Sequence, residues 1–536
     1  MHAQGTQAVV NSQMLVSRIT QPRSASRWLV PLLGLYALAW VFHGQGGLIK
    51  PDETWFLQIV RRILSGEVLY RDVEYGATPL ALYVTVPFVA LFGAQLLVIR
   101  SVYMVFFAGS VLLARKISQR LARSPGAGAG VVLALCVCAQ PRSLLPLYNP
   151  LAYLFLLGCL TAALRWQQDG SRKALALAGL CAGLCFSSKQ TVGAYALAAL
   201  LVVVFLERLW RPDGCSKLAQ PLQTVVAWFG VAVILSLLPV AFSGSGSEFL
   251  DQTIATKPAY VRFSGISYWQ NLRLLAGTIS SARTLALSNA GLIYWRSLFL
   301  LPPLTLLLLL ATLWRDRAGQ RGPTVTVLLF AGAGLLGLFP IADDNHLFVA
   351  MPPILVGLAY AWRRLASGCH PAVRRLVQAG VLAWLSAGFL FLVLSPPIRL
   401  WLGTVRVSGL PHLRGVLIRT LQETEINRHT QALREVAAPG ERLLLLTPYA
   451  SLYYLTAELR NPTPFDYPLV HVFGPHGEED LARAVARGGL SSVCLDTLYY
   501  TPLFFSRLRP ARLEQAVREH LRPGPNLGFC TLYRTR

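Results

Sequence analysis

The residues best suited to chemistry lie between Gly46 and Pro87, where an acidic pair, Asp52 and Glu53, directly follows a proline. A carboxylate held beside a reacting hydroxyl can take its proton as a general base, so both are candidate catalytic residues. The same Pro-Asp-Glu start is also typical of a helix N-terminus, where Asp52 would cap the helix and Glu53 would favour its dipole. The apolar spacing of residues 54–65 predicts an amphipathic helix at a membrane surface, with Arg61 and Arg62 facing elsewhere.

Carboxylates are distributed unevenly along the apolar part of the chain. Before residue 395 there are 13, and nine fall in segments that we expect on the outer face: Asp52, Glu53, Glu67, Asp72, Glu74, Glu248, Asp251, Asp343 and Asp344. The other four, Asp169, Glu207, Asp213 and Asp316, fall in expected cytoplasmic loops. The outer face is therefore where we expect acid–base chemistry or cation binding. Solvation alone equally explains single loop carboxylates such as Glu67, Glu248 and Asp251.

Four cationic or ionisable side chains are candidate binding residues: Arg71, Lys189, Arg262 and His346. Lys189 is the most informative, because the run Ser187 to Gln190 interrupts two apolar stretches. An ionisable group at the end of a span costs free energy unless it has a functional role or its charged end snorkels to the interface. Solvated or headgroup contacts would explain Arg71 and Arg262 as well. His346 next to Asp343 and Asp344 would be able to bind a divalent metal, but the strict ligand spacing of a metal site is missing. A capping or surface role is therefore favoured for His346, and we expect no cofactor.

Composition indicates a membrane protein. Of the 536 residues 54% are hydrophobic and 14% are charged, against about 25% charged in ordinary soluble domains. The formal net charge of +24 does not indicate nucleic acid, because the basic residues cluster in short loops between apolar runs, as the positive-inside rule predicts for cytoplasmic loops. These runs predict a polytopic helical bundle of about 11 transmembrane helices.

The predicted organisation has three parts: a cytoplasmic tail (1–27), a transmembrane module (28–394) and a C-terminal domain (395–536). The module contains a first outer loop at 43–77 and a second large outer loop at 243–290. Residues 78–114 are expected to hold one crossing and a broken or re-entrant piece around Gly93 to Arg100. The other spans are expected near 28–42, 128–146, 150–164, 174–188, 191–206, 221–241, 293–313, 324–341, 347–362 and 376–394.

The last 142 residues alternate strand-like and helix-like runs, which predicts a small extracytoplasmic α/β domain. Strands are expected at 442–447, 491–496 and 528–533, and helices at 426–437, 478–487 and 513–521. Cys494 and Cys530 lie in this region and would be able to pair if it is exported. The cysteines at 136, 138, 159, 181 and 185 lie in apolar segments and are expected to be small core residues.

The first outer loop resembles that of membrane glycosyltransferases with the GT-C fold, in particular the branch of protein O-mannosyltransferases and the lipid A aminoarabinose transferase (family 39-like). The matching pieces are Pro51-Asp52-Glu53, GEVLYRD (66–72), Thr78-Pro79-Leu80, and Leu91-Phe92-Gly93 followed by Arg100. A second match is Asp343-Asp344-Asn345-His346 leading into Met351-Pro352-Pro353. Some relatives have an Arg-Tyr pair where this chain has His346-Leu347-Phe348. The resemblance covers about residues 28–394 in layout.

The resemblance implies transfer of a sugar from a polyprenyl-phosphate donor to an acceptor at the outer face of the membrane, with inversion. It implies Asp52 as general base, the four cationic candidates near the donor phosphate, and Glu53 in a tuning or orienting role. Residues expected to contact substrate are Asp72, Asn149, Gln190, Asp343 and Asp344. The acceptor is a lipid, a polysaccharide or a protein.

Two other functions are compatible with the sequence. A transporter or flippase of lipid-linked sugars would place polar groups at mid-membrane and show related halves, and neither is clear. A non-catalytic membrane protein with an exported binding domain would tolerate replacement of Asp52. Arginine greatly outnumbers lysine, which occurs only at 50, 116, 173, 189, 217 and 257, and this suggests a GC-rich bacterial genome and hence the bacterial inner membrane.

Overall fold

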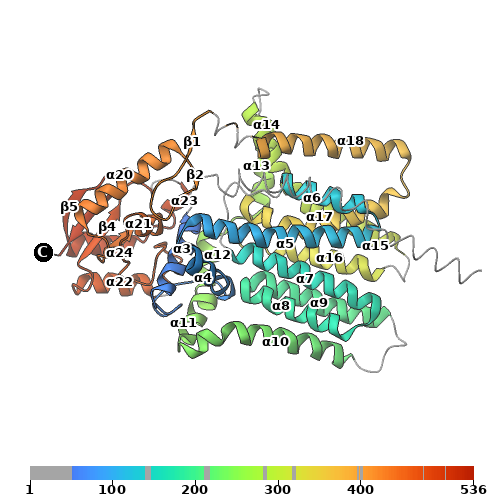
Figure 1. The fold of residues 1–536 in the computed structure, drawn as a ribbon, viewed down its shortest axis with the longest axis horizontal. Coiled ribbons are helices and arrows are strands. Elements are labelled where there is room, and N and C mark those ends of the chain that lie inside the picture. The colour runs from blue at the N-terminus through green and yellow to red at the C-terminus, as the bar shows by residue number, and fades with distance from the viewer. Residues whose placement is uncertain are drawn as a thin grey trace, which may run out of the picture.

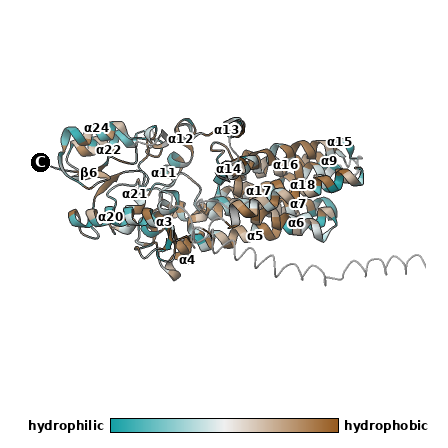
Figure 2. Cartoon of the chain, turned by 90° about the horizontal axis from the view of Figure 1, so that it is seen from above, coloured by the Kyte–Doolittle hydropathy of each residue, from teal (hydrophilic) through white to brown (hydrophobic). Residues whose placement is uncertain are grey.

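The computed structural model describes residues 51–138, 147–210, 218–281, 287–316, 321–394, 398, 402–474, 476–500 and 503–535. It has two parts, a bundle of long helices and a smaller domain that holds the C-terminus (Figure 1). Hydrophobic residues dominate the bundle, whereas hydrophilic residues are frequent on the helices of the smaller domain (Figure 2). The expected cytoplasmic tail and the span at 28–42 lie outside the described residues.

The bundle consists of these helices: α5 (Leu96–Ala122), α6 (Pro125–Cys138), α7 (Tyr148–Asp169), α8 (Arg172–Ser188), α9 (Gln190–Trp210), α10 (Ala219–Phe242), α14 (Leu287–Ser297) with the short helical turn η3 (Leu298–Leu300) and α15 (Leu301–Arg315), α16 (Arg321–Leu336), α17 (Asp344–Ala366) and α18 (Pro371–Gly388) with η5 (Phe389–Leu394). In the described part, five helices are long and apolar enough to cross a membrane: Leu96–Ala122, Gln190–Trp210, Ala219–Phe242, Ala290–Arg315 and Asp344–Ala366. A multi-pass helical fold is therefore present, and the described part of the chain does not confirm the expected total of 11 crossings.

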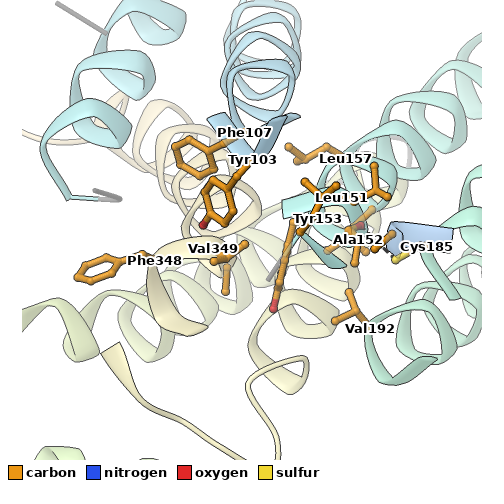
Figure 3. Packing of buried hydrophobic residues seen from close by; sticks show 14 of the residues in the cluster. Tyr103, Phe107, Leu151, Ala152, Tyr153, Leu157, Cys185, Val192, Phe348 and Val349 are labelled. Carbon is orange, nitrogen blue, oxygen red and sulfur yellow. Dashed lines mark hydrogen bonds between the residues drawn. The ribbon is translucent and has the colours of Figure 1, made fainter. Parts of the chain in front are cut away.

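Small residues let neighbouring helices of the bundle approach closely. A Cβ atom on Gly179 of α8 would lie 2.6 Å from the carbonyl oxygen of Val225 in α10, and one on Gly183 would lie 2.5 Å from that of Phe229. Two glycines one turn apart at a helix contact are typical of membrane helix pairs. On its other side α8 meets α7, where Cys185 is packed among the core residues shown in Figure 3. The end of α8, at Lys189, is therefore held in a fixed place.

The first segment (residues 51–79) connects to the bundle through two helices. Helix α3 (Pro51–Leu64) begins three residues earlier than predicted, and α4 (Leu80–Phe92) has 13 residues, too few to span a bilayer. Gly93, at φ +86°, ends α4 and allows the turn into α5. The broken piece that we expected to extend from Gly93 to Arg100 is thus confined to Gly93–Gln95, and Arg100 belongs to the long helix α5.

The structure packs α3 against protein, whereas the amphipathic pattern suggests a helix on a membrane surface. Nine of its 14 residues are buried, because α3 is packed against α4, α5 and α21 (Ala450–Thr456) of the C-terminal domain. Arg62 donates hydrogen bonds to the Asp466 carboxylate at 2.9 Å and to the Glu67 carboxylate at 2.6 Å. A buried charge needs such partners, so the C-terminal domain supplies the carboxylate that lets Arg62 enter the interface.

The second segment (residues 243–281) is helical rather than the expected loop. It contains α11 (Gly246–Leu250), the π-helical turn η2 (Asp251–Ala255), α12 (Lys257–Ser264) and α13 (Tyr268–Ser281). It is attached to the first segment by Gln252, which accepts a hydrogen bond from the backbone N–H of Tyr75 and donates one to the carbonyl of Tyr70. These contacts bring two segments far apart in the sequence to the same end of the bundle.

The C-terminal domain has the α/β character that its alternating pattern predicts. Its elements are a hairpin of β1 (Val405–Val407) and β2 (Leu417–Arg419), a sheet of β3 (Leu444–Leu446), β4 (Ser492–Asp496), β6 (Cys530–Arg534) and β5 (Arg522–Asn526) in that order, and the helices α20 (Thr420–Val436), α21, α22 (Gly477–Ala486), α23 (Leu503–Ser506) and α24 (Ala511–His520). Strands β3 and β4 are parallel and the remaining neighbours antiparallel. Strand β5 escaped prediction, because its sequence, RPGPN, contains two prolines, which only an edge strand tolerates.

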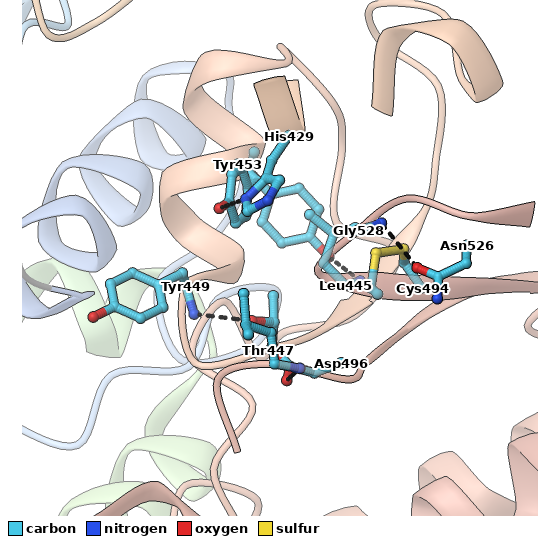
Figure 4. The surroundings of a disulfide bond; sticks show 12 residues. His429, Leu445, Thr447, Tyr449, Tyr453, Cys494, Asp496, Asn526 and Gly528 are labelled. Atoms are coloured by element: carbon cyan, nitrogen blue, oxygen red, sulfur yellow. Dashed lines mark hydrogen bonds between the residues drawn. A yellow bond between two sulfur atoms is a disulfide. The ribbon is translucent and has the colours of Figure 1, made fainter. Parts of the chain in front are cut away.

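A disulfide joins Cys494 of β4 to Cys530 of β6 (Figure 4). The two cysteines are 36 residues apart in the sequence, and the bond lies beside the aromatic residues Tyr453 and Phe529 of one buried cluster. The pairing considered from the sequence is thus present in the structure.

Replacing both cysteines by alanine should destabilise this domain. Closing a loop of 36 residues is worth about 4 kcal/mol by chain entropy. Hydrogen exchange in β4 and β6 of the full chain should then accelerate, and reductant should have the same effect on the native protein. Cys369→Ala, which removes a free and partly exposed cysteine, is the control. Unchanged exchange after reduction would contradict the expectation.

Candidate functional site

Asp52 lies in the first turn of α3, and its side chain is partly exposed. Its carboxylate is close enough to act electrostatically on four tyrosines: Tyr148, Tyr260, Tyr449 and Tyr467. They come from the start of α7, from α12 and from two loops of the C-terminal domain, and each is also partly exposed. Burial, with a smaller contribution from Asp52, raises the pKa of Tyr260 and of Tyr467 above its ordinary value. These phenols are therefore neutral hydrogen-bond donors around the one carboxylate.

Glu53 points into a different environment from Asp52. Its carboxylate accepts a hydrogen bond from Arg100 of α5 at 2.7 Å, and both side chains are 2% exposed. Tyr103, one turn further along α5, lies within electrostatic range of the same carboxylate. This pair fixes the first turn of α3 on α5. The structure thus places the Glu53 carboxylate on Arg100, away from the tyrosines around Asp52.

Lys189 lies between α8 and α9, at the end of the bundle that carries Asp52. Its ammonium group donates to Oδ1 of Asn149 at 2.9 Å, and Asn149 is 1% exposed. Asp343 and a second lysine, Lys257, lie within electrostatic range of Lys189. Gln190, the first residue of α9, donates to the carbonyl of Gly76 at 3.3 Å. Of the sequence candidates, the structure therefore brings Lys189, Asn149 and Asp343 together, with Gln190 tied to the first segment.

Lys257 and Glu74 are the residues that sequence reasoning missed. Lys257, at the start of α12, donates a hydrogen bond to the carbonyl of Gly76. A Cβ atom on Gly76 would lie 3.3 Å from the Lys257 nitrogen and 3.6 Å from Oε1 of Glu74, so a side chain there would crowd both groups. Burial lowers the pKa of Lys257, and Glu74 opposes that shift. The sequence feature that could have pointed to Lys257 is the rarity of lysine, since the chain contains only six.

Glu74 is 5% exposed, and its Oε2 atom has no hydrogen-bond partner in the described part of the chain. Burial raises the pKa of this carboxyl from 4.5 to about 8, although Lys257 opposes the shift. A carboxyl whose pKa is raised on folding stabilises the fold fully below about pH 4.5, and that stabilisation is lost as the pH rises towards 8.

Glu74→Gln should therefore be more stable relative to the native chain at pH 8 than at pH 5. The measurement is the thermal unfolding midpoint of both proteins at the two pH values, with Glu248→Gln as the control for a partly exposed carboxylate. A stability difference between variant and native chain that does not move in favour of the variant from pH 5 to pH 8 would contradict the expectation, because it would mean that Lys257 keeps Glu74 ionised.

Asp343 caps the N-terminus of α17. Its Oδ1 atom accepts a hydrogen bond from the backbone N–H of His346 at 2.9 Å and lies 2.7 Å from Nδ1 of the His346 ring. Asp344 follows in the first turn, where its charge favours the helix dipole. Asp343 is also within electrostatic range of Tyr260 and Lys189, so it borders the site. Within the described ranges no group of three metal-ligating side chains is present.

In the described part of the chain, the side-chain hydrogen bonds and ion pairs of Arg71 and Asp72 are made with near neighbours in the sequence. Arg71 pairs with Asp72 at 2.9 Å, and its side chain is 54% exposed. Asp72 accepts a hydrogen bond from the backbone N–H of Val68, which stabilises the turn. Arg262 is exposed on α12 beside the ring of Phe263. The structure brings none of these three side chains into the described cluster around Asp52, Lys189 and Lys257.

Comparison with known proteins gives the fold a name. Residues 77–240 match a family model described as dolichyl-phosphate-mannose-protein mannosyltransferase, which is well under half of the chain. The crystal structure of ArnT from Cupriavidus metallidurans bound to undecaprenyl phosphate is similar at a TM-score of 0.56 and 15% identity, over 95% of this chain and 98% of that one. The apo state of ArnT is similar at a TM-score of 0.53 and 16% identity, with the same coverage. No curated protein sequence matches the chain.

These matches confirm the resemblance that the first segment suggested. The fold is the GT-C fold of membrane glycosyltransferases, of the type found in ArnT, and residues 77–240 match the protein mannosyltransferase family model.

Proposed function

We propose that this protein is a membrane glycosyltransferase that moves a sugar from a polyprenyl-phosphate donor to an acceptor hydroxyl. The observation that carries the proposal is the pair of partly buried lysines, Lys189 and Lys257, near the partly exposed Asp52. The two ammonium groups repel each other, and neither forms an ion pair with a carboxylate in the described part of the chain. Partial burial makes two neighbouring cations costly, and a phosphate group would supply a charge that pairs with both. ArnT, which has the same fold, was crystallised with such a lipid phosphate.

The chemistry requires a single base. The acceptor oxygen attacks the anomeric carbon of the donor sugar, and the bond from that carbon to the phosphate oxygen breaks. The polyprenyl phosphate leaves with the electron pair of that bond, and it needs no proton because a phosphate is a stable anion. Asp52 takes the proton of the acceptor hydroxyl, and direct displacement inverts the configuration of the sugar. The second carboxylate that glycoside hydrolysis requires has no function here.

The two lysines would act on the leaving phosphate. Positive groups held in place near the developing charge stabilise a transition state most where water is excluded. Both lysines are fixed before substrate arrives, Lys189 by Asn149 and Lys257 by the carbonyl of Gly76. Asn149, Gln190 and Asp343 hold or border these groups. Glu53 and Arg100 keep Asp52 in position.

We place this reaction at the outer face of a bacterial inner membrane. Basic residues such as Arg120 of α5, Arg208 of α9 and Arg363 of α17 lie in the last turns of helices that begin at the end carrying Asp52. By the positive-inside rule that opposite end is cytoplasmic, so the site and the C-terminal domain are extracytoplasmic. The disulfide between Cys494 and Cys530 supports an oxidising compartment.

Lys189→Met and Lys257→Met should each weaken binding of undecaprenyl phosphate by the purified chain. Loss of one hydrogen bond to a charged group corresponds to about 10- to 100-fold in Kd. The measurement is titration of the lipid in detergent, with Lys173→Met, an exposed lysine at the start of α8, as the control. If the native chain and the three variants bind the lipid with equal affinity, neither Lys189 nor Lys257 contacts the donor phosphate.

A further inference from the structure

The C-terminal domain reaches Asp52 with aromatic side chains. Tyr467 directly follows Asp466, the carboxylate that pairs with Arg62 of α3. Its ring lies 6.2 Å from that of Trp55, one turn after Asp52 on the same helix. Tyr449 immediately precedes α21, the helix packed on α3. In Figure 4 its ring points away from the disulfide, towards the ribbon of the first segment.

The aromatic side chains continue outward from Tyr449. The ring of Tyr499 lies 4.6 Å from that of Tyr449, and the Tyr499 hydroxyl donates to Oε1 of Glu425 at 3.2 Å. Tyr467, Tyr449, Tyr499 and Glu425 are all partly exposed. We call Trp55, Tyr467, Tyr449 and Tyr499 the aromatic track. It begins beside Asp52 and ends at Glu425.

We propose that the aromatic track binds the acceptor and that this acceptor is a neutral saccharide. The inference rests on the proposed function, since it assigns the second substrate of the same site. A sugar ring has an apolar face that packs on an aromatic ring, and its hydroxyls at the edge suit phenol and carboxylate groups. A saccharide lying along the track would present a hydroxyl of its end residue to Asp52.

Charge favours a neutral saccharide over one that carries phosphate. The ionised groups that act on Tyr449 are Glu425 and Asp52, and both are acidic. Tyr499 is likewise acted on by Glu425. Acids at both ends of the track would repel an anionic acceptor, whereas the lysines that suit phosphate lie on the bundle side of Asp52.

The neighbouring backbone does not favour a peptide. Extended peptides commonly bind by adding a strand to a free sheet edge. Strand β3 is at the edge of its sheet nearest to Tyr449 in the sequence, but the hydroxyl of Tyr454 occupies that edge. It accepts from the backbone N–H of Leu445 at 2.9 Å and donates to the carbonyl of Leu443 at 3.0 Å.

The test is binding of the labelled full chain, in detergent, to three arrays: neutral bacterial oligosaccharides, phosphorylated oligosaccharides, and peptides rich in serine and threonine. We expect binding to neutral oligosaccharides, with about a tenfold loss for Tyr449→Ala and for Tyr499→Ala. Tyr449→Phe keeps the ring and should lose only about threefold. Tyr195→Ala, in α9 of the bundle, is the control, and thermal unfolding checks that each variant is folded.

Preference for peptides or for phosphorylated sugars, binding to none of the arrays, or binding that Tyr449→Ala and Tyr499→Ala leave unchanged would each overturn the inference. The assay uses no donor and no transfer, so its outcome is separable from that of the proposed function. Transfer without neutral saccharide binding would overturn the acceptor assignment alone. Saccharide binding without transfer would count against the glycosyltransferase.

Discussion

Asp52→Asn should lower sugar transfer by about 10²- to 10⁴-fold, the usual contribution of a general base. The substitution keeps the size of the side chain and removes its ability to take a proton. The surrounding phenols of Tyr260 and Tyr467 cannot replace the base, because burial raises the pKa of each. Binding of undecaprenyl phosphate should stay at the native level, since the two lysines are untouched.

The measurement is the initial rate of transfer by purified native and variant protein at equal amount, with a polyprenyl-phosphate sugar as donor. Asp251→Asn, an exposed aspartate in the second segment, is the matched control and should transfer at the native rate. If Asp52→Asn also keeps the native rate, Asp52 only stabilises the first turn of α3, and the base is another group.

Breaking the ion pair between Glu53 and Arg100 should cause the largest loss of stability. Both side chains are 2% exposed, and their closest atoms lie 2.7 Å apart. Removal of one partner leaves an uncompensated buried charge, which costs about 3–5 kcal/mol. Arg100→Met and Glu53→Leu should therefore each lower the thermal unfolding midpoint strongly, and transfer should fall with the population of folded protein.

The double variant Glu53→Leu/Arg100→Leu separates the charge effect from packing. It leaves no unpaired charge, so it should be more stable than either single variant. Arg165→Met is the control, because it breaks the exposed ion pair between Arg165 and Asp169 in the last turns of α7. It should lower the free energy of unfolding by at most about 1 kcal/mol. A single variant at Glu53 or Arg100 with the native midpoint would show that the pair does not hold α3 on α5.

Local sequence signals were sufficient for part of this site. Asp52 follows a proline at the start of an amphipathic pattern, and Lys189 interrupts two apolar runs, so each stands out within a few residues. The long apolar runs placed the main helices of the bundle. Alternating patterns also placed β4 and α22, because hydrophobic periodicity reflects which face of an element is buried.

Contacts between distant segments could not be predicted in this way. Lys257 and Gly76 are 181 residues apart, and Arg62 and Asp466 are 404 residues apart, so no local pattern marks either pair. The second segment was predicted to be a loop, because its polar residues are typical of solvent-exposed loops. In the structure these polar residues instead contact the first segment, as Gln252 does.

The same limit applies to Arg71 and Arg262, which the structure leaves outside the cluster around Asp52, Lys189 and Lys257. An arginine in a loop near the site has the right charge to bind phosphate, but its direction depends on the turn that carries it. Asp72 fixes the turn at Val68, and Arg71 pairs with Asp72 at the surface. Lys257 lies in the same helix as Arg262 but is partly buried, whereas Arg262 is exposed, so the position of a cation on the helix decides whether it faces the site.

The central claim is that a polyprenyl-phosphate sugar is consumed, and the most direct measurement follows both parts of that donor. The purified chain in proteoliposomes would be given a donor labelled in the sugar and in the phosphate, with an acceptor oligosaccharide. We predict that free polyprenyl phosphate forms in equal amount to the transferred sugar, and that Asp52→Asn suppresses both. Intact donor that crosses the bilayer without conversion would contradict the account and identify a transporter.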